Sequence, residues 1–275
     1  MKNNRPREQG FSLIELMVAV TLGLALSATA ASLLVRAVEA ANLQRGLAEI
    51  NETSQFLYQF MRHEFYMAGF NGENQLAVTP IDWEKSTDSL TDKKIAALRR
   101  KTNIEDLSDK IAIHRTASIN DYDCIGAALT AGQNYISILY AQEDSEGEHV
   151  FFCKRVIDND AKNAVSLISG VDRFQVQYEV EQWVDGVLTN TFMSRAQIDS
   201  ISAANRKIIS VRLGLLLSDT GNPSLPLKDQ TWDILDKTYD TTKSQDKELK
   251  NGHFHRVMTW TIPLRNVSRQ IPVRI

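Results

Sequence analysis

An almost uninterrupted apolar run near the N-terminus constrains this chain more than any other feature. From Phe11 to Val35 the only charged residue is Glu15, and a short basic leader, residues 1–10, precedes the run. As a helix with a rise of about 1.5 Å per residue, the run covers about 37 Å, enough to cross a hydrocarbon core of about 30 Å. The positive-inside rule keeps the leader in the cytoplasm and sends the rest of the chain across the membrane. The run therefore predicts a transmembrane helix over 11–35.

A cleavable secretory signal is the ordinary alternative. Ala28-Thr29-Ala30 offers an A-x-A cleavage site after the apolar run. However, the run exceeds the usual length of such signals, and a carboxylate at Glu15 costs up to about 2.5–3.5 kcal/mol at the centre of a span and less near its end. A carboxylate retained at that cost predicts a partner for it, so the helix is expected to do more than anchor the chain. A plain membrane anchor with a chance glutamate is the remaining alternative.

A leader that ends in Gly10 is followed by Phe11-Ser12-Leu13-Ile14-Glu15-Leu16 and the long apolar helix. This junction resembles the type III signal of type IV prepilins. This resemblance implies cleavage after Gly10 by a membrane-embedded prepilin peptidase and N-methylation of Phe11, the new N-terminus. It also implies that Glu15 pairs with the N-terminal amine of a neighbouring subunit. In an apolar filament core, two unpaired charges would each cost several kcal/mol, so pairing is physically favoured.

Beyond the transmembrane segment, residues 36–70 predict an amphipathic continuation of the same helix. Apolar side chains recur there at helical spacing, and Gly69 is placed to end the helix. The recurring residues are Val38, Leu43, Leu47, Ile50, Leu57, Met61 and Phe65. A coiled-coil dimer is the alternative for this part, but regular heptads do not persist.

Residues 71–275 predict a β-rich globular head. Segments 135–141 and 149–157 flank a polar, glycine-containing loop and predict a hairpin. Apolar residues alternate with polar ones over 173–180 and again over 209–217, which is typical of half-buried antiparallel strands. The last strand contains Pro263, which favours an edge position or a strand end. Residues 218–253 form a long polar insertion before that strand, and a loop of such length is generally functional or mobile.

A long N-terminal helix followed by an antiparallel sheet gives an α+β fold that resembles the pilin fold. The finer resemblance is to PilW-type minor pilins, and it is carried by Asp123-Cys124-Ile125-Gly126, the strand around Val171–Tyr178 and Pro263-Leu264-Arg265-Asn266.

The two cysteines, Cys124 and Cys153, predict a single structural disulfide in an oxidising compartment, because no zinc-ligand or C-x-x-C pattern surrounds them. His253 and His255 could share one face of a strand, but without a third ligand they predict a solvated strand edge and no metal site. Fragments of calcium loops at 143–146 and 158–160 are interpreted as turns. No catalytic motif or cofactor-binding loop is recognisable, so we expect neither an enzyme nor a cofactor.

These features predict a minor pilin of a type IV pilus that helps to initiate assembly, at or near the tip. The expected partners are other minor pilins, the major pilin, prepilin peptidase, the inner-membrane assembly platform and a tip adhesin. A net charge of −3 does not favour a nucleic-acid site. The chain is expected as a single-pass protein of the bacterial inner membrane with a periplasmic head, and then in the filament at the cell surface. A J-type minor pseudopilin of type II secretion and a membrane-tethered periplasmic binding module are the alternatives.

Overall fold

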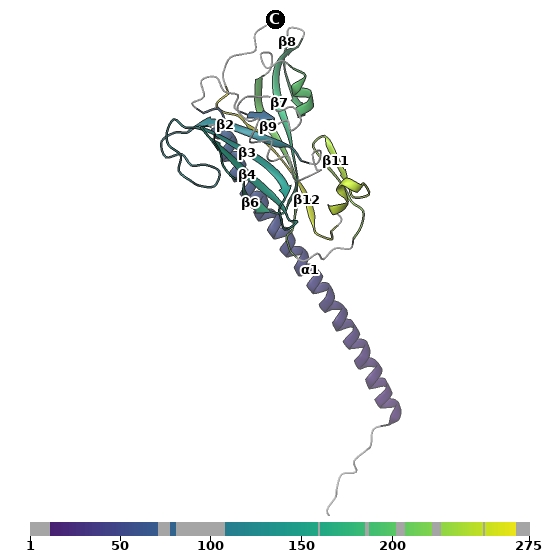
Figure 1. Ribbon diagram of the computed structural model, residues 1–275. Helices are drawn as coiled ribbons and strands as arrows, with labels where there is room; N and C mark the ends of the chain where they lie inside the picture. The colour runs from purple at the N-terminus through teal and green to yellow at the C-terminus, as the bar shows by residue number, and fades with distance from the viewer. Residues whose placement is uncertain are drawn as a thin grey trace, which may run out of the picture. The chain divides into compact units, whose positions relative to one another are not determined.

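The computed structural model confirms the predicted α+β fold class, a long N-terminal helix followed by antiparallel sheets (Figure 1). It describes residues 12–70, 78–80, 108–158, 160–184, 187–201, 207–221, 227–249 and 251–267. The chain divides into two compact units, Met1–Arg45 and Gly46–Ile275. We call the part of the first unit from Leu13 to Arg45 the stem, and the second unit the head.

Helix α1 (Leu13–Met67) belongs to both units, and its character changes at Gly46. Within the head, the apolar side chains at helical spacing are fully buried: Ile50, Leu57, Met61 and Phe65. Each such side chain stabilises the folded head by about 1.5–3 kcal/mol relative to its exposed state. Val38 and Leu43 are instead exposed, so the buried face of the helix is shorter than the predicted segment 36–70.

The C-terminal end of α1 lies where the sequence predicts it. Gly69 adopts a φ of 75°, a left-handed conformation that glycine reaches without steric cost, and its N–H donates to the His114 carbonyl at 2.7 Å. Thr116 N–H then donates to the Phe70 carbonyl. The helix end is therefore hydrogen-bonded directly to a strand of the head.

Two antiparallel sheets share one core against α1. The larger runs in the order β1-β2-β3-β4-β5, with β6 paired to β4, and the smaller in the order β12-β9-β7-β8. The bounds of the larger sheet are β1 Val78–Pro80, β2 Lys110–Thr116, β3 Asn134–Glu143, β4 His149–Ile157, β5 Asp160–Ala161 and β6 Val165–Ser169. Those of the smaller are β7 Val171–Val184, β8 Val187–Met193, β9 Lys207–Ser218 and β12 His255–Pro263, with the short helix α3 (Arg195–Asp199) after β8.

The predicted strands are confirmed. β3 and β4 form the expected hairpin, and β12 is an edge strand that ends at Pro263. The core residues of β7 are buried as the alternation predicts: Phe174, Val176, Tyr178 and Val180. Phe151 of the larger sheet packs edge-on against Phe174 at 5.3 Å between ring centroids, which joins the two sheets in one core.

Segment 218–253 differs from the predicted polar loop. It contains the hairpin β10 (Thr231–Ile234) and β11 (Lys237–Asp240), followed by the 3-10 helix η3 (Ser244–Leu249). A small apolar cluster joins it to β9: Leu216, Ile234, Tyr239 and Leu249. Gly214 of β9 makes this approach feasible, since a Cβ there would lie only 2.6 Å from an Ile234 methyl. The insertion therefore covers the face of the smaller sheet that points away from α1.

This cover explains why β7 is not half-buried over its whole length. Arg173 and Gln175, on the face opposite the α1-packed core, are each only 2% exposed. Gln175 Nε2 donates to Tyr239 Oη at 2.6 Å, and Arg173 pairs with Glu248 at 2.7 Å. The polar side chains of the alternation are thus buried against the insertion, which supplies a partner to each.

A buried ion cluster joins the helix to the larger sheet. Arg115 of β2 pairs with Glu64 of α1 at 3.2 Å and with Asp121 at 3.3 Å, and Ser137 Oγ donates to Glu64 at 2.6 Å. Arg115 and Glu64 are 1% and 2% exposed. Removing one partner from such a cluster leaves an uncompensated buried charge, which typically costs about 3–5 kcal/mol.

Asp109, just before β2, predicts a pH dependence of stability. Its carboxylate accepts a hydrogen bond from Val176 N–H of β7, and burial raises its pKa to about 6. Because the folded state holds this proton more tightly than the unfolded chain, the free energy of unfolding falls as pH rises from about 4 to 6. We expect Asp109→Asn to leave stability unchanged near pH 4 and to raise it by about 1–3 kcal/mol at pH 7.

Urea unfolding of the full chain in detergent micelles, at both pH values, measures this difference. The matched control is Glu146→Gln, which alters an exposed carboxylate in a turn and should change stability by less than about 0.5 kcal/mol at either pH. Equal effects of Asp109→Asn at the two pH values would contradict the assignment.

Candidate assembly site

The N-terminal end of α1 carries a reciprocal cap. Glu15 N–H donates to Ser12 Oγ at 3.2 Å, and Ser12 N–H donates to a Glu15 carboxylate oxygen at 3.5 Å. This is the capping-box arrangement of Ser-x-x-Glu, which satisfies two backbone donors that a helix start leaves without partners. The negative charge also lies at the positive end of the helix dipole. Glu15 thus has a local structural role in addition to its predicted pairing with another subunit.

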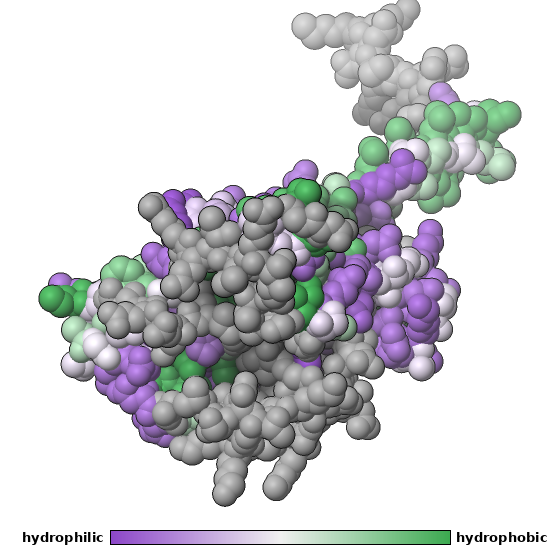
Figure 2. All heavy atoms as spheres, turned by 90° about the horizontal axis from the view of Figure 1, so that it is seen from above, coloured by the Kyte–Doolittle hydropathy of each residue, from purple (hydrophilic) through white to green (hydrophobic). Residues whose placement is uncertain are grey.

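From Leu13 to Val35 the stem surface is apolar and has no partner within the described chain. Its large side chains are well exposed, with Leu13 at 78%, Leu26 at 70% and Leu34 at 67%. The described residues contain one helix long and apolar enough to cross a membrane, and none of its most apolar window is buried. Figure 2 shows the hydrophobic colouring continuing along this part of α1. So much exposed apolar surface requires a bilayer or neighbouring subunits to cover it.

The hydroxyl groups of the stem are satisfied within the helix. Thr21 Oγ1 donates to the Val18 carbonyl at 2.9 Å, and Ser27 Oγ to the Gly23 carbonyl at 2.8 Å. These side chains therefore add no uncompensated polarity to the lipid-facing or subunit-facing surface. Beyond its cap, Glu15 makes no ion pair within the described residues, so its carboxylate can accept a cation from outside the chain.

Two of the predicted site residues, Gly10 and Phe11, lie outside the described residues. Cleavage between them and methylation of Phe11 stay predictions, and so does the pairing of Glu15 with a neighbouring amine. Ser12 is the described residue nearest to the expected new N-terminus.

Cys124 and Cys153 form the predicted disulfide. Cys153 lies on β4 and is fully buried, whereas Cys124 lies in the loop between β2 and β3 and is 7% exposed. The bond closes a sequence separation of 29 residues, for which the chain-entropy model gives about 3–4 kcal/mol. The disulfide therefore fixes the β2–β3 loop to the centre of the larger sheet.

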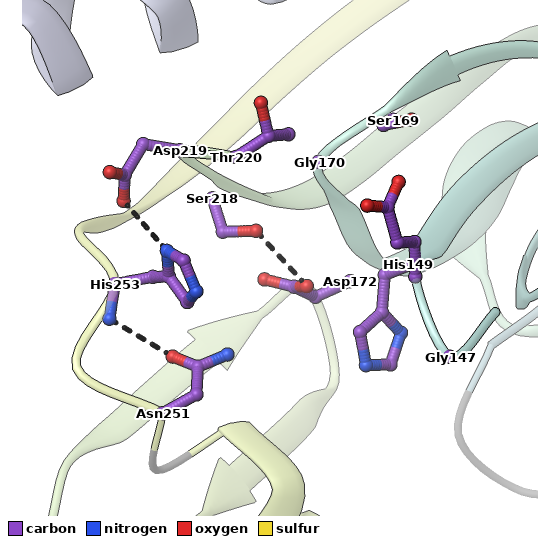
Figure 3. A pocket seen from close by; sticks show the side chains of 11 residues that line it. Gly147, His149, Ser169, Gly170, Asp172, Ser218, Asp219, Thr220, Asn251 and His253 are labelled. Atoms are coloured by element: carbon purple, nitrogen blue, oxygen red, sulfur yellow. Dashed lines mark hydrogen bonds and ion pairs between the residues drawn. The ribbon is translucent and has the colours of Figure 1, made fainter. Parts of the chain in front are cut away.

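A small polar pocket lies where the insertion returns to the sheets (Figure 3). Its volume is about 150 Å³, enough for several water molecules. Asp172 of β7 accepts a hydrogen bond from Ser218 Oγ at 3.1 Å, and Figure 3 shows Ser218 and His149 on either side of it. Asp219 accepts from Phe254 N–H at 2.6 Å. The carboxylates of Asp172 and Asp219 thus connect the chain segments that meet at the pocket.

His253 and His255, at the C-terminal end of the insertion, do not form the solvated strand edge that the sequence predicts. The His255 side chain is only 1% exposed, with Nε2 3.3 Å from a carboxylate oxygen of Asp172, and His253 Nδ1 lies 3.5 Å from Asp219. Burial alone would raise the pKa of Asp172, but His255, and then His149 and Arg173, hold it below its usual value. Each histidine therefore faces a carboxylate, and these contacts link the end of the insertion to β7 and to the end of β9.

The described residues contain no group of three His, Cys, Asp or Glu side chains arranged as metal ligands. The calcium-like fragment at 143–146 is a turn, in which Asp144 accepts hydrogen bonds from the backbone of Glu146 and Glu148. These backbone bonds lower the pKa of Asp144. The carboxylate is therefore engaged in closing the hairpin.

Two features of these sites were not predicted from the sequence. The Ser12-x-x-Glu15 cap has a sequence signature, because serine followed three residues later by glutamate at the start of an apolar run is typical of a capping box. The Asp172–His255 pair has none, since its members are far apart in the chain and each pattern around them is that of an ordinary strand.

Comparison with known proteins gives two sequence matches. Residues 138–266 match the family described as Type IV Pilus-assembly protein W, and residues 5–31 match the Prokaryotic N-terminal methylation motif. The second match includes Gly10, Phe11 and Glu15, and the first includes β4 with Cys153. No curated protein matches the chain.

Among solved structures, the chain is similar to a type IV-like pilin from Thermus thermophilus. The sequence identity is 12% and the TM-score is 0.42, and the alignment covers 81% of this chain and 98% of that one.

The two roles of Glu15 can be separated by substitution. Ser12→Ala removes the cap, at about 1 kcal/mol of helix stability, but keeps the carboxylate. Glu15→Gln keeps the size and an acceptor oxygen but removes the charge. We expect both variants to insert into the membrane, Ser12→Ala to enter filaments close to the wild-type level, and Glu15→Gln to be largely excluded from them. Immunoblots of membrane and sheared-filament fractions measure both steps. Equal incorporation of the two variants would assign Glu15 to capping alone.

Proposed function

The chain is a PilW-like type IV pilin, and from that premise we propose that it is a minor pilin that helps to initiate assembly of the pilus, at or near its tip. The observation that carries the proposal is the first part of the stem, Leu13–Val35, an exposed apolar helix with one charge, Glu15, at its capped N-terminal end. Such a helix suits insertion first in a bilayer and then among other helices. The proposed role is structural and involves no catalysis.

The proposed mechanism starts with membrane anchoring by the stem and cleavage after Gly10. The new amine on Phe11 and the carboxylate of Glu15 then carry opposite charges close to one helix end. In an apolar surrounding, a subunit gains most when its carboxylate meets the amine of a neighbour, because both charges are then compensated. Each added subunit repeats this pairing. The stem therefore supplies the attraction between subunits and also fixes their positions along the filament axis.

The head supports a position with low copy number. The insertion at 218–253 adds a folded layer on the smaller sheet, which enlarges the head beyond α1 and the two sheets that pack against it. A larger head is easier to accommodate where the subunit has no neighbour above it. This supports placement at the tip, where few copies are needed to begin a filament.

The processing step has a direct test. We expect protein recovered from filaments to begin at Phe11 and to carry one N-methyl group, as intact-mass analysis and N-terminal peptide sequencing can determine. A Gly10→Val variant, which blocks the expected cleavage site, should accumulate in the membrane at full length. A mature N-terminus after Ala30 would contradict processing as a prepilin and favour a secreted or tethered binding module.

The role in assembly is tested by deletion of the gene. We expect fewer surface pili, with filament number reduced more than filament length, and loss of twitching or DNA uptake, while the secreted proteome is unchanged. Electron microscopy and mass spectrometry of culture supernatants measure the two outcomes. Normal piliation combined with a defect in exported proteins would transfer the chain to the J-type minor pseudopilins.

A further inference from the structure

The chain between η3 and β12 contains an asparagine followed directly by a glycine, Asn251-Gly252. Asn251 lines the small polar pocket, and both residues are partly buried. Such a pair can react with itself, because the backbone nitrogen of the glycine can attack the side-chain carbonyl carbon of the asparagine, and glycine has no Cβ to hinder the approach. Whether the reaction occurs in the folded chain depends on the hydrogen bonds of the groups that take part.

The side chain of Asn251 is bent back over the backbone that follows it. Its Oδ1 accepts a hydrogen bond from His253 N–H at 3.1 Å, drawn as a dashed line in Figure 3. This arrangement is an Asx turn, in which the side-chain carbonyl closes over the next peptide unit. The bond keeps the Cγ carbonyl on the side of the Gly252 nitrogen and polarises it toward Oδ1, which makes Cγ a better electrophile.

The two nitrogens that exchange places at Cγ are not restrained. In the part of the chain that the structure describes, the attacking Gly252 N–H donates to no acceptor. Nδ2 of Asn251, the leaving group, also donates to none of the described residues. A glycine N–H held in a sheet or a turn would have to break its hydrogen bond before it could attack, whereas this one is free to do so.

We propose that Asn251-Gly252 is a site of spontaneous modification, at which the folded protein converts Asn251 to aspartate and isoaspartate. The Gly252 nitrogen bonds to Cγ of Asn251, the Cγ–Nδ2 bond breaks, and Nδ2 leaves as ammonia with the proton of the Gly252 N–H. The product is a cyclic succinimide. Water, for which the pocket has room, then opens the ring at either carbonyl. One opening gives aspartate, and the other gives isoaspartate, in which the backbone runs through the former side chain.

The new carboxylate is formed beside other carboxylates. Glu148, Asp172 and Asp219 line the same pocket, and like charges at short range disfavour one another. Asp219 is also the group that holds this end of the insertion, since it accepts from Phe254 N–H at 2.6 Å and lies 3.5 Å from His253 Nδ1. Isoaspartate lengthens the backbone by one carbon just before these contacts. The conversion therefore loosens the attachment of the insertion to the end of β9.

Peptide mapping of the full chain, incubated in detergent micelles, tests the reaction. We expect the peptide that contains position 251 to gain about 1 Da, the difference between an amide and a carboxyl group, and isoaspartyl methyltransferase to label it. The rate should rise with pH, because the Gly252 nitrogen attacks after losing its proton. Asn71-Gly72, outside the described residues, falls in a different peptide, so mapping separates the two pairs. A rate that is independent of pH would overturn the mechanism.

A synthetic peptide of residues 246–256 provides the rate without the fold. We expect the folded chain to convert Asn251 within about tenfold of the peptide rate, because no hydrogen bond restrains the reacting nitrogens. The internal control is Asn190, an exposed asparagine of β8 that is followed by Thr191 and should remain unchanged in the same samples. Conversion in the peptide alone, or equal conversion at Asn190, would overturn the proposal.

Hydrogen exchange tests the consequence. The matched control is Asn251→Gln, which keeps an amide but would need a six-membered ring to react. We expect Phe254 N–H to exchange about tenfold faster or more in the converted chain than in Asn251→Gln incubated alongside it, because its bond to Asp219 opens more often. Residues 257–262, which pair with β9, should exchange equally in both. Equal exchange at Phe254 would show that conversion leaves the insertion attached, which would overturn the loosening.

Discussion

The buried pairing of Glu64 with Arg115 is the interaction on which the head depends. Glu64 belongs to α1 and Arg115 to β2, and the same guanidinium also pairs with Asp121 of the loop between β2 and β3. One arginine thus connects the helix, the larger sheet and the loop. Its ring neighbour Tyr135 lies 4.5 Å from the guanidinium, which adds a cation–π contact. The charge of Arg115, which is only 1% exposed, is tolerated in the core because Glu64, Asp121 and the ring of Tyr135 surround it.

The remaining architecture follows from how each apolar surface is covered. The head half of α1 is covered by both sheets, and the outer face of the smaller sheet is covered by the insertion. The apolar part of the stem has no cover within the described chain. This exposed apolar surface therefore needs cover from a bilayer or from other chains.

Much of the fold could be predicted from local patterns. The period of Phe174, Val176 and Tyr178 predicts β7, and the position of Gly69 predicts the helix end, because both depend on nearest-neighbour geometry. The burial of Arg173 and Gln175 could not be predicted, since their partners Glu248 and Tyr239 lie more than sixty residues away. The sequence predicts a loop at 218–253, where the structure has a folded insertion, and the reason is related. Its few apolar residues are too widely spaced to give a period, yet they suffice to pack on Leu216.

The docked half of α1 also determines how the head resists mechanical load. A force that pulls on the stem reaches the head at Gly46, because α1 continues from one unit into the other. The buried contacts of Ile50, Leu57, Met61 and Phe65 are spread along the helix axis, with the Glu64 ion pair near its far end. A force along that axis loads all of these contacts in shear at the same time. No single contact can therefore separate before the others, as would happen if the helix were peeled off from one end. The half of α1 that packs in the head is therefore arranged to resist a pull along its own axis.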